Sequence, residues 1–261
     1  MTKIDLVGKR ALVTGGSSGI GEAVAAELAQ AGADVAINYV SHGEAAEAGA
    51  GRVREMGRRA LALEADVADA AAVKKMFAAI DAEWGGIDIL INNAGIDGPR
   101  AVSWESEIDA WRKVLDVNLF GAFYCAREAL KRMVAQKGGV VLNMTSVHEI
   151  VAWGGYSAYA TSKAGLSMLT KTLAQEAAPF GVRVLALAPG AIKTPVNAAV
   201  WQDAAGLADL NAKIAMGRMG ERGEIAGMAV MLVSGVASYV TGTTVMVDGG
   251  LTDYPDFAHG G

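Results

Sequence analysis

Short apolar runs alternate with longer segments whose apolar positions recur at helical spacing along most of the chain. The short runs are apolar along their length, which is typical of strands buried on both faces of a sheet. The predicted strands are Arg10–Thr14, Asp34–Tyr39, Leu61–Glu64, Ile87–Ile91, Val140–Met144, Val182–Ala188 and Thr244–Val247. The predicted helices are Ile20–Ala31, Glu44–Met56, Ala70–Glu83, Ser106–Leu115, Val117–Gln136, Ser157–Ala178 and Glu224–Val233.

This alternation predicts an α/β fold in which a parallel sheet carries helices on both faces. The chain has neither an internal repeat nor a Pro/Ser-rich linker, so one domain over residues 1–261 is the simplest interpretation. Gly32, Gly57 and Gly85 follow predicted helices, where glycine commonly caps a helix end. Residues 191–220 have weaker periodicity, and we expect them to form a mobile cover over the site.

Composition disfavours several classes of protein. The net charge of −5 and the pI of about 5.3 are unlike those of a nucleic-acid-binding protein, so no nucleic-acid partner is expected. No apolar run is long enough to span a bilayer and the N-terminus has no signal-peptide core, so no membrane partner is expected. The single cysteine, Cys125, is interpreted as a buried apolar residue. We expect a cytoplasmic protein without intrachain disulfides.

Tyr159 and Lys163 are four residues apart in a predicted helix and therefore share one of its faces. A free tyrosine has a pKa of about 10 and is a poor base at neutral pH. A nearby ammonium group lowers that pKa and makes the phenol usable as an acid or a base. The spacing alone occurs by chance in many helices, but here Asn118 and Ser146 precede it.

A glycine-rich turn joins the first predicted strand to the first predicted helix. Glycine lets the backbone approach a phosphate closely, and a helix N-terminus offers free N–H groups with a partial positive charge. The spacing is Gly-x-x-x-Gly-x-Gly, and its strand–turn–helix context indicates dinucleotide binding. The candidate cofactor residues of this turn are Gly15, Ser17, Ser18, Gly19, Ile20 and Gly21.

Further candidates follow the third and fourth predicted strands, where ligands bind in a doubly wound sheet. Asn93 can brace the glycine-rich turn, and Ala94 and Gly95 leave room for a cofactor. Asp66 and Val67 are candidates for contact with an adenine, although Asp66 alone is equally typical of a carboxylate near a helix N-cap.

Together these motifs resemble the short-chain dehydrogenase/reductase family over nearly the whole chain. The matching positions are Thr14-Gly15, Gly19-Ile20-Gly21, Asn92-Asn93-Ala94-Gly95, Asn118, Ser146, Tyr159, Lys163, Pro189-Gly190 and Thr194. The resemblance implies a Rossmann-like doubly wound seven-stranded parallel sheet, a nicotinamide cofactor and a homotetramer. It places the cofactor half at about 1–145 and the catalytic and substrate half at about 146–261.

The resemblance also implies roles for individual residues. Tyr159 exchanges a proton with the substrate hydroxyl, Lys163 lowers the pKa of Tyr159 and holds the ribose hydroxyls, and Ser146 hydrogen bonds the reacting oxygen. Asn118 matches the residue that kinks its helix and positions a water molecule in a proton relay. The other positions assigned to the cofactor are Pro189, Gly190, Ile192 and Thr194, the last on the nicotinamide carboxamide.

Within the family, the runs around His148, Trp153 and residues 189–198, and the ending at 237–257, resemble bacterial glucose 1-dehydrogenases. This likeness implies oxidation of β-D-glucose to D-glucono-1,5-lactone. Asp97, His148 and Asn197 are the candidate sugar contacts. Each has an alternative: Asp97 as a solvent-facing loop carboxylate, His148 as a brace for its loop, and Asn197 as a helix cap. Asp97 stands where these enzymes often carry Glu, so the identity of the sugar is not decided by this likeness.

The end of the second predicted strand bears on the choice of cofactor. NAD-selective members usually carry an acid at the position of Tyr39, and none is present. Ser41 and His42 can hydrogen bond a phosphate, but Val40 stands where glucose dehydrogenases often carry Arg. The expectation is use of both NAD and NADP with a modest preference for NADP. No metal is expected, because His42, His148 and His259 share no ligand spacing.

Two other functions remain open. One is a reductase for a ketone or a 3-oxoacyl thioester on the same catalytic set. The other is a dinucleotide-binding protein without catalysis, which the four expected catalytic residue types disfavour. Helices 117–136 and 157–178 are apolar on more than one face, which predicts a homo-oligomer. The aromatic tail Tyr254–Gly261 is expected to contact a neighbouring subunit.

Overall fold

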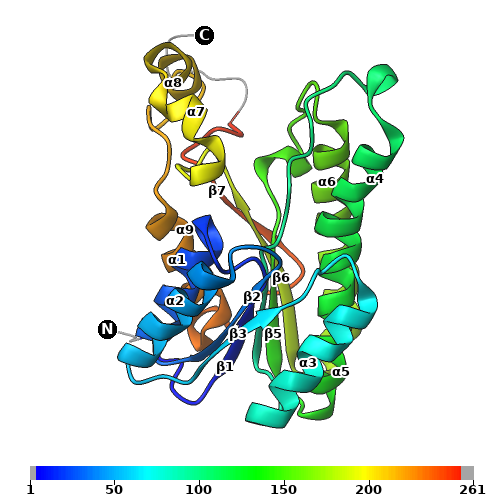
Figure 1. Ribbon diagram of the computed structural model, residues 1–261, viewed down its shortest axis with the longest axis vertical. Helices are drawn as coiled ribbons and strands as arrows, with labels where there is room; N and C mark the ends of the chain where they lie inside the picture. Colours follow the sequence, from blue (N-terminus) through cyan, green and yellow to red (C-terminus); the bar gives the residue numbers. More distant parts are fainter. Residues whose placement is uncertain (1–3, 254–261) are drawn as a thin grey trace.

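A computed structural model describes residues 4–253 as one parallel sheet with helices on both faces (Figure 1). The order across the sheet is β3-β2-β1-β4-β5-β6-β7, and every described pairing is parallel. The strands are β1 (Arg10–Val13), β2 (Asp34–Tyr39), β3 (Ala60–Glu64), β4 (Ile89–Asn92), β5 (Gly139–Met144), β6 (Val182–Pro189) and β7 (Thr244–Val247). The predicted Rossmann-like doubly wound sheet is confirmed, with shifts only at strand ends.

The helices divide between the two faces of the sheet (Figure 1). Helices α1, α2 and α9 cover one face, and α3, α5 and α6 cover the other. The nine helices of the described residues are α1 (Gly19–Gln30), α2 (Gly43–Glu55), α3 (Ala70–Trp84), α4 (Ile108–Leu115), α5 (Ala122–Ala135), α6 (Ser157–Ala177), α7 (Ala198–Gln202), α8 (Ala204–Asn211) and α9 (Arg222–Val233).

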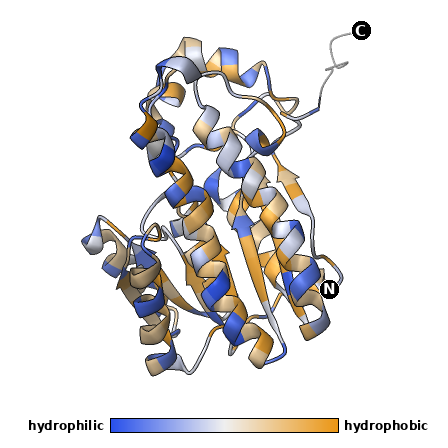
Figure 2. Ribbon diagram, turned by 90° about the vertical axis from the view of Figure 1, so that its right-hand side faces the viewer, coloured by the Kyte–Doolittle hydropathy of each residue, from blue (hydrophilic) through white to orange (hydrophobic). Residues whose placement is uncertain are grey.

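Alternation along each strand builds a separate core on each face. Val13 and Ile91 point toward the core under α1 and α9, whereas Leu12 and Leu90 point toward the core under α3 and α5. Both sets are buried, which explains why the strands read as continuous apolar runs (Figure 2). Cys125 lies in the second core, where burial raises the pKa of its thiol to about 12, consistent with the predicted apolar role.

The two helices predicted at 106–115 and 117–136 are present as α4 and α5, but the second begins later than predicted because a π-helix takes its first residues. A 3₁₀ turn at Ser103–Glu105 precedes α4, and a π-helix at Asp116–Gly121 joins α4 to α5. Leu115 and Gly121 both have helical backbone angles, so no break separates the two helices. The chain lacks a proline at this junction, and a one-turn π-helix absorbs the irregularity instead.

The segment 191–220 is helical in part and attached at its base. It holds a 3₁₀ turn at Pro195–Asn197 followed by α7 and α8. Ile192 forms a β-bridge with Gly220, and the Met216 amide donates to the Gly249 carbonyl at 2.9 Å. The predicted mobility of this segment stays a prediction. The predicted tail contact of 254–261 lies outside the described residues.

The sheet order defines where ligands can bind. After β1 the chain goes to β2 on one side, and β4 lies on the other, so the strand order reverses beside β1. Gly15, Asn93 and Ser146 follow β1, β4 and β5 and therefore share the carboxyl edge of the sheet. Within residues 4–253, no helix has the length and apolar character needed to cross a membrane. No group of three metal-binding side chains gathers in that same range.

Candidate active site

The glycine-rich turn is held in a conformation that needs its glycines. Gly15 and Gly19 have φ values of 60° and 59°, in the left-handed region that glycine tolerates. A Cβ on Gly21 would collide with the Gly15 carbonyl and lie 2.5 Å from the Asn93 side-chain nitrogen. Gly21 is therefore required for close packing of α1 on the turn.

Asn93 and Thr14 brace this turn, as the sequence predicts for Asn93. The Asn93 amide donates to the carbonyls of Thr14 at 3.0 Å and Gly15 at 3.1 Å. The Thr14 hydroxyl accepts from the backbone N–H groups of Asn93 and Ala94, both at 3.0 Å. The loop after β4 therefore fixes the turn after β1 from the side, and Thr14 performs a bracing role that sequence reasoning did not assign.

The turn fits a pyrophosphate-bearing cofactor. Ser18 is the N-cap of α1 but its side chain makes no capping hydrogen bond, which leaves the first amides of the helix available. A Cβ placed on Gly19 would meet nothing within 4 Å, so this side of the turn is open. A Cβ on Gly95 would lie 3.3 Å from Asn118 Oδ1 and 3.6 Å from Lys163 Nζ. Gly95, which follows Asn93 and Ala94 along the chain, therefore lies beside the predicted catalytic residues Asn118 and Lys163.

Ser146 is buried at the end of β5 and caps the 3₁₀ turn Val147–Glu149. Its Oγ accepts from the His148 amide at 3.2 Å. Because that contact uses an acceptor position, the hydroxyl proton remains free to be donated. The Ser146 hydroxyl acts to lower the pKa of the Tyr159 phenol.

Burial dominates the titration of Tyr159. Desolvation raises the pKa of the phenol to about 12, with Ser146 lowering it and the Asp97 charge raising it. The expected lowering by Lys163 does not prevail in the free protein. The Lys163 ammonium lies 5.5 Å from the centroid of the Tyr159 ring, and it donates to the Met144 carbonyl at 2.8 Å.

Lys163 is buried on the same face of α6 as Tyr159. Burial lowers the pKa of its ammonium to about 8, while the charges of Asp97 and Glu149 raise it. At pH 7 Lys163 is therefore mostly protonated. The structure brings Tyr159, Lys163 and Ser146 together, as the sequence predicts.

Asn118 lies in the π-helix and joins three segments. Its Oδ1 accepts from the Ile96 amide at 2.8 Å, and its Nδ2 donates to the Ile96 carbonyl at 2.9 Å and to Ser162 Oγ at 3.1 Å. The expected irregularity of this helix is present as the π-helix. Ser162, which no sequence motif marked, ties Asn118 to the helix that carries Tyr159 and Lys163.

His148 is a hydrogen-bond acceptor toward the site. Its Nδ1 lies 3.0 Å from the Val151 carbonyl, which only accepts, so Nδ1 carries the proton. Burial lowers the pKa of the imidazole, and the ring is neutral at pH 7. The remaining nitrogen, Nε2, therefore presents a lone pair. Asp97 is half-buried and electrostatically coupled to His148 and Lys163, and burial raises the pKa of its carboxyl group.

Two aromatic residues that sequence reasoning did not assign to the substrate complete this side of the site. The Trp153 ring stacks between His148, at a centroid distance of 4.4 Å, and Tyr156, at 4.0 Å. Its edge faces the Tyr159 ring at 5.7 Å. The three stacked rings form an aromatic wall beside Tyr159. Trp153 is 36% exposed, so part of the wall is open to a ligand.

Comparison with known proteins assigns the family. The model of the enoyl-(acyl carrier protein) reductase family matches residues 15–252. The chain is 44% identical over 257 residues to 3beta-hydroxysteroid dehydrogenase 1 of Eggerthella lenta, with 98% of each protein covered. It is 38% identical over 252 residues to glucose 1-dehydrogenase 2 of Bacillus subtilis, covering 96% of this chain and 97% of that protein. The chain belongs to the short-chain dehydrogenase/reductase family.

A solved structure agrees with this assignment. Gluconate 5-dehydrogenase from Burkholderia cenocepacia, in complex with NADP and tartrate, matches with a TM-score of 0.91 at 38% identity. The match covers 96% of this chain and 98% of that chain. This dehydrogenase/reductase is therefore an NAD(P)-dependent oxidoreductase. The names of its relatives include a steroid and a sugar, so family membership does not define its substrate.

Other predicted cofactor positions lie on the same edge of the dehydrogenase/reductase. Tyr39 is partly buried, with its ring over Gly43 at the start of α2, and Ser41 is exposed beside it. The N-cap of α3 is Asp69 and not Asp66. The Asp66 carboxylate accepts from the Ala68 amide at 2.9 Å and from the Lys113 ammonium at 3.2 Å. The adenine contact of Asp66 stays a prediction. Val67 is buried in the core beneath α3 and α5.

The positions after β6 are fixed by packing. Pro189 ends β6, and a Cβ on Gly190 would lie only 2.7 Å from the Asp248 Cα. Ile192 is buried at the base of the cover segment. Thr194 Oγ1 donates to Asn197 Oδ1 at 3.1 Å, and Asn197 Nδ2 donates to the Ile192 carbonyl at 2.8 Å.

The structure thus gives Asn197 the capping role that the sequence left as its alternative. Its Oδ1 also accepts from the Thr194 amide at 2.9 Å, and together they form a capping box. Only one N–H of the Asn197 side chain remains without an assigned partner among the described residues. Its sugar contact stays a prediction with little hydrogen-bonding capacity left to support it.

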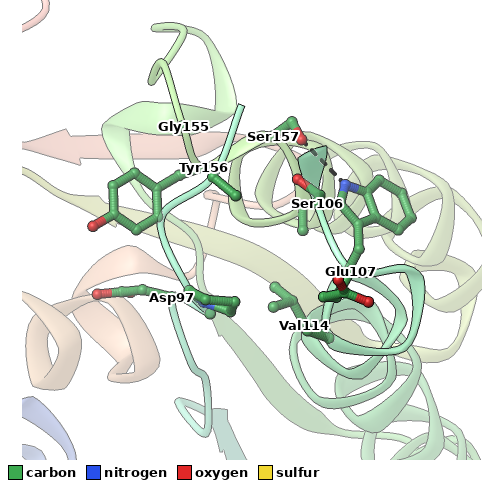
Figure 3. A pocket seen from close by; sticks show the side chains of 13 residues that line it. Asp97, Ser106, Glu107, Val114, Gly155, Tyr156 and Ser157 are labelled. Atoms are coloured by element: carbon green, nitrogen blue, oxygen red, sulfur yellow. Dashed lines mark hydrogen bonds between the residues drawn. The ribbon is translucent and has the colours of Figure 1, made fainter. Parts of the chain in front are cut away.

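A small pocket lies beside the catalytic residues, behind Asp97 (Figure 3). It encloses about 310 Å³, including space open to solvent, between the loop after β4, helix α4 and the start of α6. Asp97 and Tyr156 line one side, and Ser106, Glu107 and Val114 line the other. Trp111 and Ser157 also line the pocket, and the Trp111 indole N–H donates to Ser157 Oγ at 3.1 Å. Ser146, Tyr159 and Lys163 do not line this pocket.

Proposed function

We propose that the protein interconverts a ring-shaped secondary alcohol and its carbonyl form, with NAD or NADP as hydride carrier. One observation carries the proposal: Ser146, Tyr159 and Lys163 converge at the carboxyl edge of the sheet, the same edge that carries the glycine-rich turn. In this proposal the turn Gly15–Gly21 holds the pyrophosphate, and Lys163 holds the ribose.

The proton step falls to the chain's own residues. In the oxidative direction the Tyr159 phenolate takes the substrate hydroxyl proton, and the Ser146 hydroxyl donates a hydrogen bond to the oxygen as charge develops there. Ser146 is suited to this task because its Oγ already accepts from the His148 amide. In the reductive direction Tyr159 returns the proton.

A phenol with a pKa of about 12 needs a cation close by to act near neutral pH. Lys163 supplies one such charge, since its pKa of about 8 keeps it protonated at pH 7. When bound, the oxidised nicotinamide supplies the hydride acceptor and a second positive charge. Asn118, joined to Ser162 on α6, keeps the helix that carries Tyr159 in place.

The substrate is proposed to be a cyclic polyol, with β-D-glucose as the first candidate. The exposed edge of Trp153 offers apolar surface, while Asp97 and neutral His148 Nε2 offer acceptors for hydroxyl groups. A pyranose has both kinds of surface: an apolar face and a rim of hydroxyls. The 38% identity to a glucose 1-dehydrogenase supports this candidate.

A second candidate is a larger alicyclic alcohol such as a 3β-hydroxysteroid. Ile150, Val151 and Trp153 leave apolar surface exposed beside the site, at 64%, 37% and 36%. That surface suits an extended apolar ring system. The 44% identity to a 3beta-hydroxysteroid dehydrogenase supports this candidate.

Use of both cofactors, with a modest preference for NADP, is also proposed. No carboxylate occupies the end of β2 itself, where Tyr39 stands, so the strand lacks the acid with which NAD-selective members repel a 2′-phosphate. The relative solved with NADP supports this choice.

We further propose a homotetramer, because Phe120, Phe123 and Met168 are 45%, 38% and 60% exposed on neighbouring helical segments. Light scattering tests that state, and a monomer mass would contradict it.

The function is tested with a panel of substrates and both cofactors. Initial rates of NAD(P) reduction are measured with aldoses, polyols and a 3β-hydroxysteroid, and NAD(P)H oxidation with ketones and a 3-oxoacyl thioester. Turnover of one ring-shaped alcohol above the others supports the proposal. Turnover of open-chain thioesters alone would contradict the assigned substrate class, and cofactor binding without any turnover would contradict catalysis.

A further inference from the structure

Glu149 has no role in the proposed reaction, yet it lies close to the residues assigned to catalysis. It is the last residue of the 3₁₀ turn that Ser146 caps. Its Oε1 accepts a hydrogen bond from Ser167 Oγ at 2.9 Å. Ser167 is buried on α6 one turn beyond Lys163, so the two side chains share a face of that helix. Glu149 thus links the loop that carries Ser146 to the helix that carries Lys163.

The carboxylate of Glu149 is poorly compensated. Its Oε2 is buried, and no donor within residues 4–253 reaches it. A carboxylate with a single hydroxyl partner retains most of its field, and that field is weakly screened away from water. A cation buried nearby gains more from it than an exposed cation would.

Lys163 is that cation. Its ammonium is buried and donates to the Met144 carbonyl at 2.8 Å. The ionisable groups near it are Asp97 from the loop after β4, Glu149 from the 3₁₀ turn and Tyr159 from α6 itself, while neutral His148 from the same 3₁₀ turn is coupled to Asp97. Asp97 and Glu149 are the two charges that oppose the effect of burial on Lys163.

We propose that Glu149 is a positioning residue that keeps Lys163 protonated in the working pH range and ties the Ser146 loop to helix α6. The inference rests on the proposed function, because it concerns the lysine assigned to that reaction. Asp97 faces the substrate side and is available to bind it. Glu149 is half-buried but its Oε2 atom is buried, so the side chain supplies a charge that substrate does not displace.

The kinetic test is the pH profile of the Glu149→Gln variant. Glutamine keeps the shape and an acceptor for Ser167 but removes the charge, so Lys163 loses its proton at lower pH. The basic limb of kcat/KM is expected to move down by on the order of one pH unit. Glu176→Gln is the matched control, because Glu176 is an exposed carboxylate on the same helix. It should leave the limb in place.

A second readout does not need a substrate. The Nζ signal of Lys163 is followed by ¹⁵N NMR against pH in the full chain, free and with NADP, and is assigned with Lys163→Arg. Glu149→Gln should lower the titration midpoint by a similar amount. An unchanged midpoint, or an equal shift in Glu176→Gln, would overturn the proposal. If no alcohol is turned over, the proposed function fails while this titration still decides the role of Glu149.

Ser167→Ala separates the charge from the attachment of the loop. This variant keeps the carboxylate but removes its hydroxyl donor, so the Lys163 midpoint should not fall. The kcat is expected to decrease at all pH values as the Ser146 loop loosens. A fall of the midpoint as large as in Glu149→Gln would show that the effect is structural, and the proposal would be wrong.

Discussion

The Lys163 ammonium lies 5.5 Å from the centroid of the Tyr159 ring, and on one face of α6 Lys163 is buried and Tyr159 is half-buried. Burial moves their pKa values in opposite directions, to about 12 for the phenol and about 8 for the ammonium. Both shifts disfavour the charged form. In the free protein the neutral forms of both side chains are therefore favoured. Cofactor binding has to supply the remaining stabilisation of the Tyr159 phenolate.

The Lys163 shift predicts how stability changes with pH. Its pKa is about 8 in the folded protein against the ordinary 10.5, so between these values the unfolded chain binds more protons. The free energy of unfolding should therefore rise with pH in this window through Lys163, by roughly 2 kcal/mol between pH 8 and 10. Well below pH 8 Lys163 is protonated in both states, so this pH dependence vanishes and the buried charge lowers the free energy of unfolding by its full amount.

The measurement compares urea unfolding of the parent and of Lys163→Met at pH 8 and pH 10. Other groups titrate in both proteins, so the difference isolates Lys163. The rise should be smaller in the variant by about 2 kcal/mol. Equal pH dependence in the two proteins would show that Lys163 is not shifted. Tyr159, whose folded pKa is raised, opposes stability only above its ordinary value of 10.

Replacing Gly21 by Ala should destabilise the cofactor turn. The added Cβ would collide with the Gly15 carbonyl and lie 2.5 Å from the Asn93 amide nitrogen, so the brace between the turns after β1 and β4 must shift. We expect a loss of about 2 kcal/mol of unfolding free energy and weaker NADP binding. Gly51→Ala on α2 is the control, because a Cβ there meets nothing within 4 Å. It should gain up to about 1 kcal/mol.

Replacing His148 tests the acceptor assigned to Nε2. Phenylalanine can still stack on Trp153 but cannot accept a hydrogen bond. KM for the ring-shaped alcohol should rise about tenfold, as expected for one lost hydrogen bond, with a smaller change in kcat. Glutamine at the same position retains an acceptor and should recover part of the loss. An unchanged KM in the phenylalanine variant would remove His148 from the substrate site.

The sequence was sufficient for the architecture because each strand is buried on both faces and therefore apolar along its length. All seven strands were predicted, and so was the meeting of Ser146, Tyr159 and Lys163. The two helices around Asn118 were also predicted, but the π-helix that joins them was not. Periodicity alone cannot detect one irregular turn within a continuous helix.

The parts of the site that the sequence could not supply depend on contacts across the fold. The aromatic wall forms because Trp153 and Tyr156 come from a loop with no periodic pattern. The capping role of Asn197 depends on its hydrogen bonds with Ile192 and Thr194. The pKa of Tyr159 likewise depends on burial, which outweighs the nearby lysine that spacing could identify.

The central claim is that Tyr159 carries the proton in an NAD(P)-dependent oxidation. The most direct test is the initial rate of NAD(P) reduction by Tyr159→Phe with the best alcohol of the panel, alongside the dissociation constant for NADP. Phenylalanine fills the same space without an exchangeable proton. The initial rate of the variant should be at least about 10²-fold lower than that of the parent, with the affinity for NADP retained. A variant that turns over the alcohol at the parent rate would contradict it.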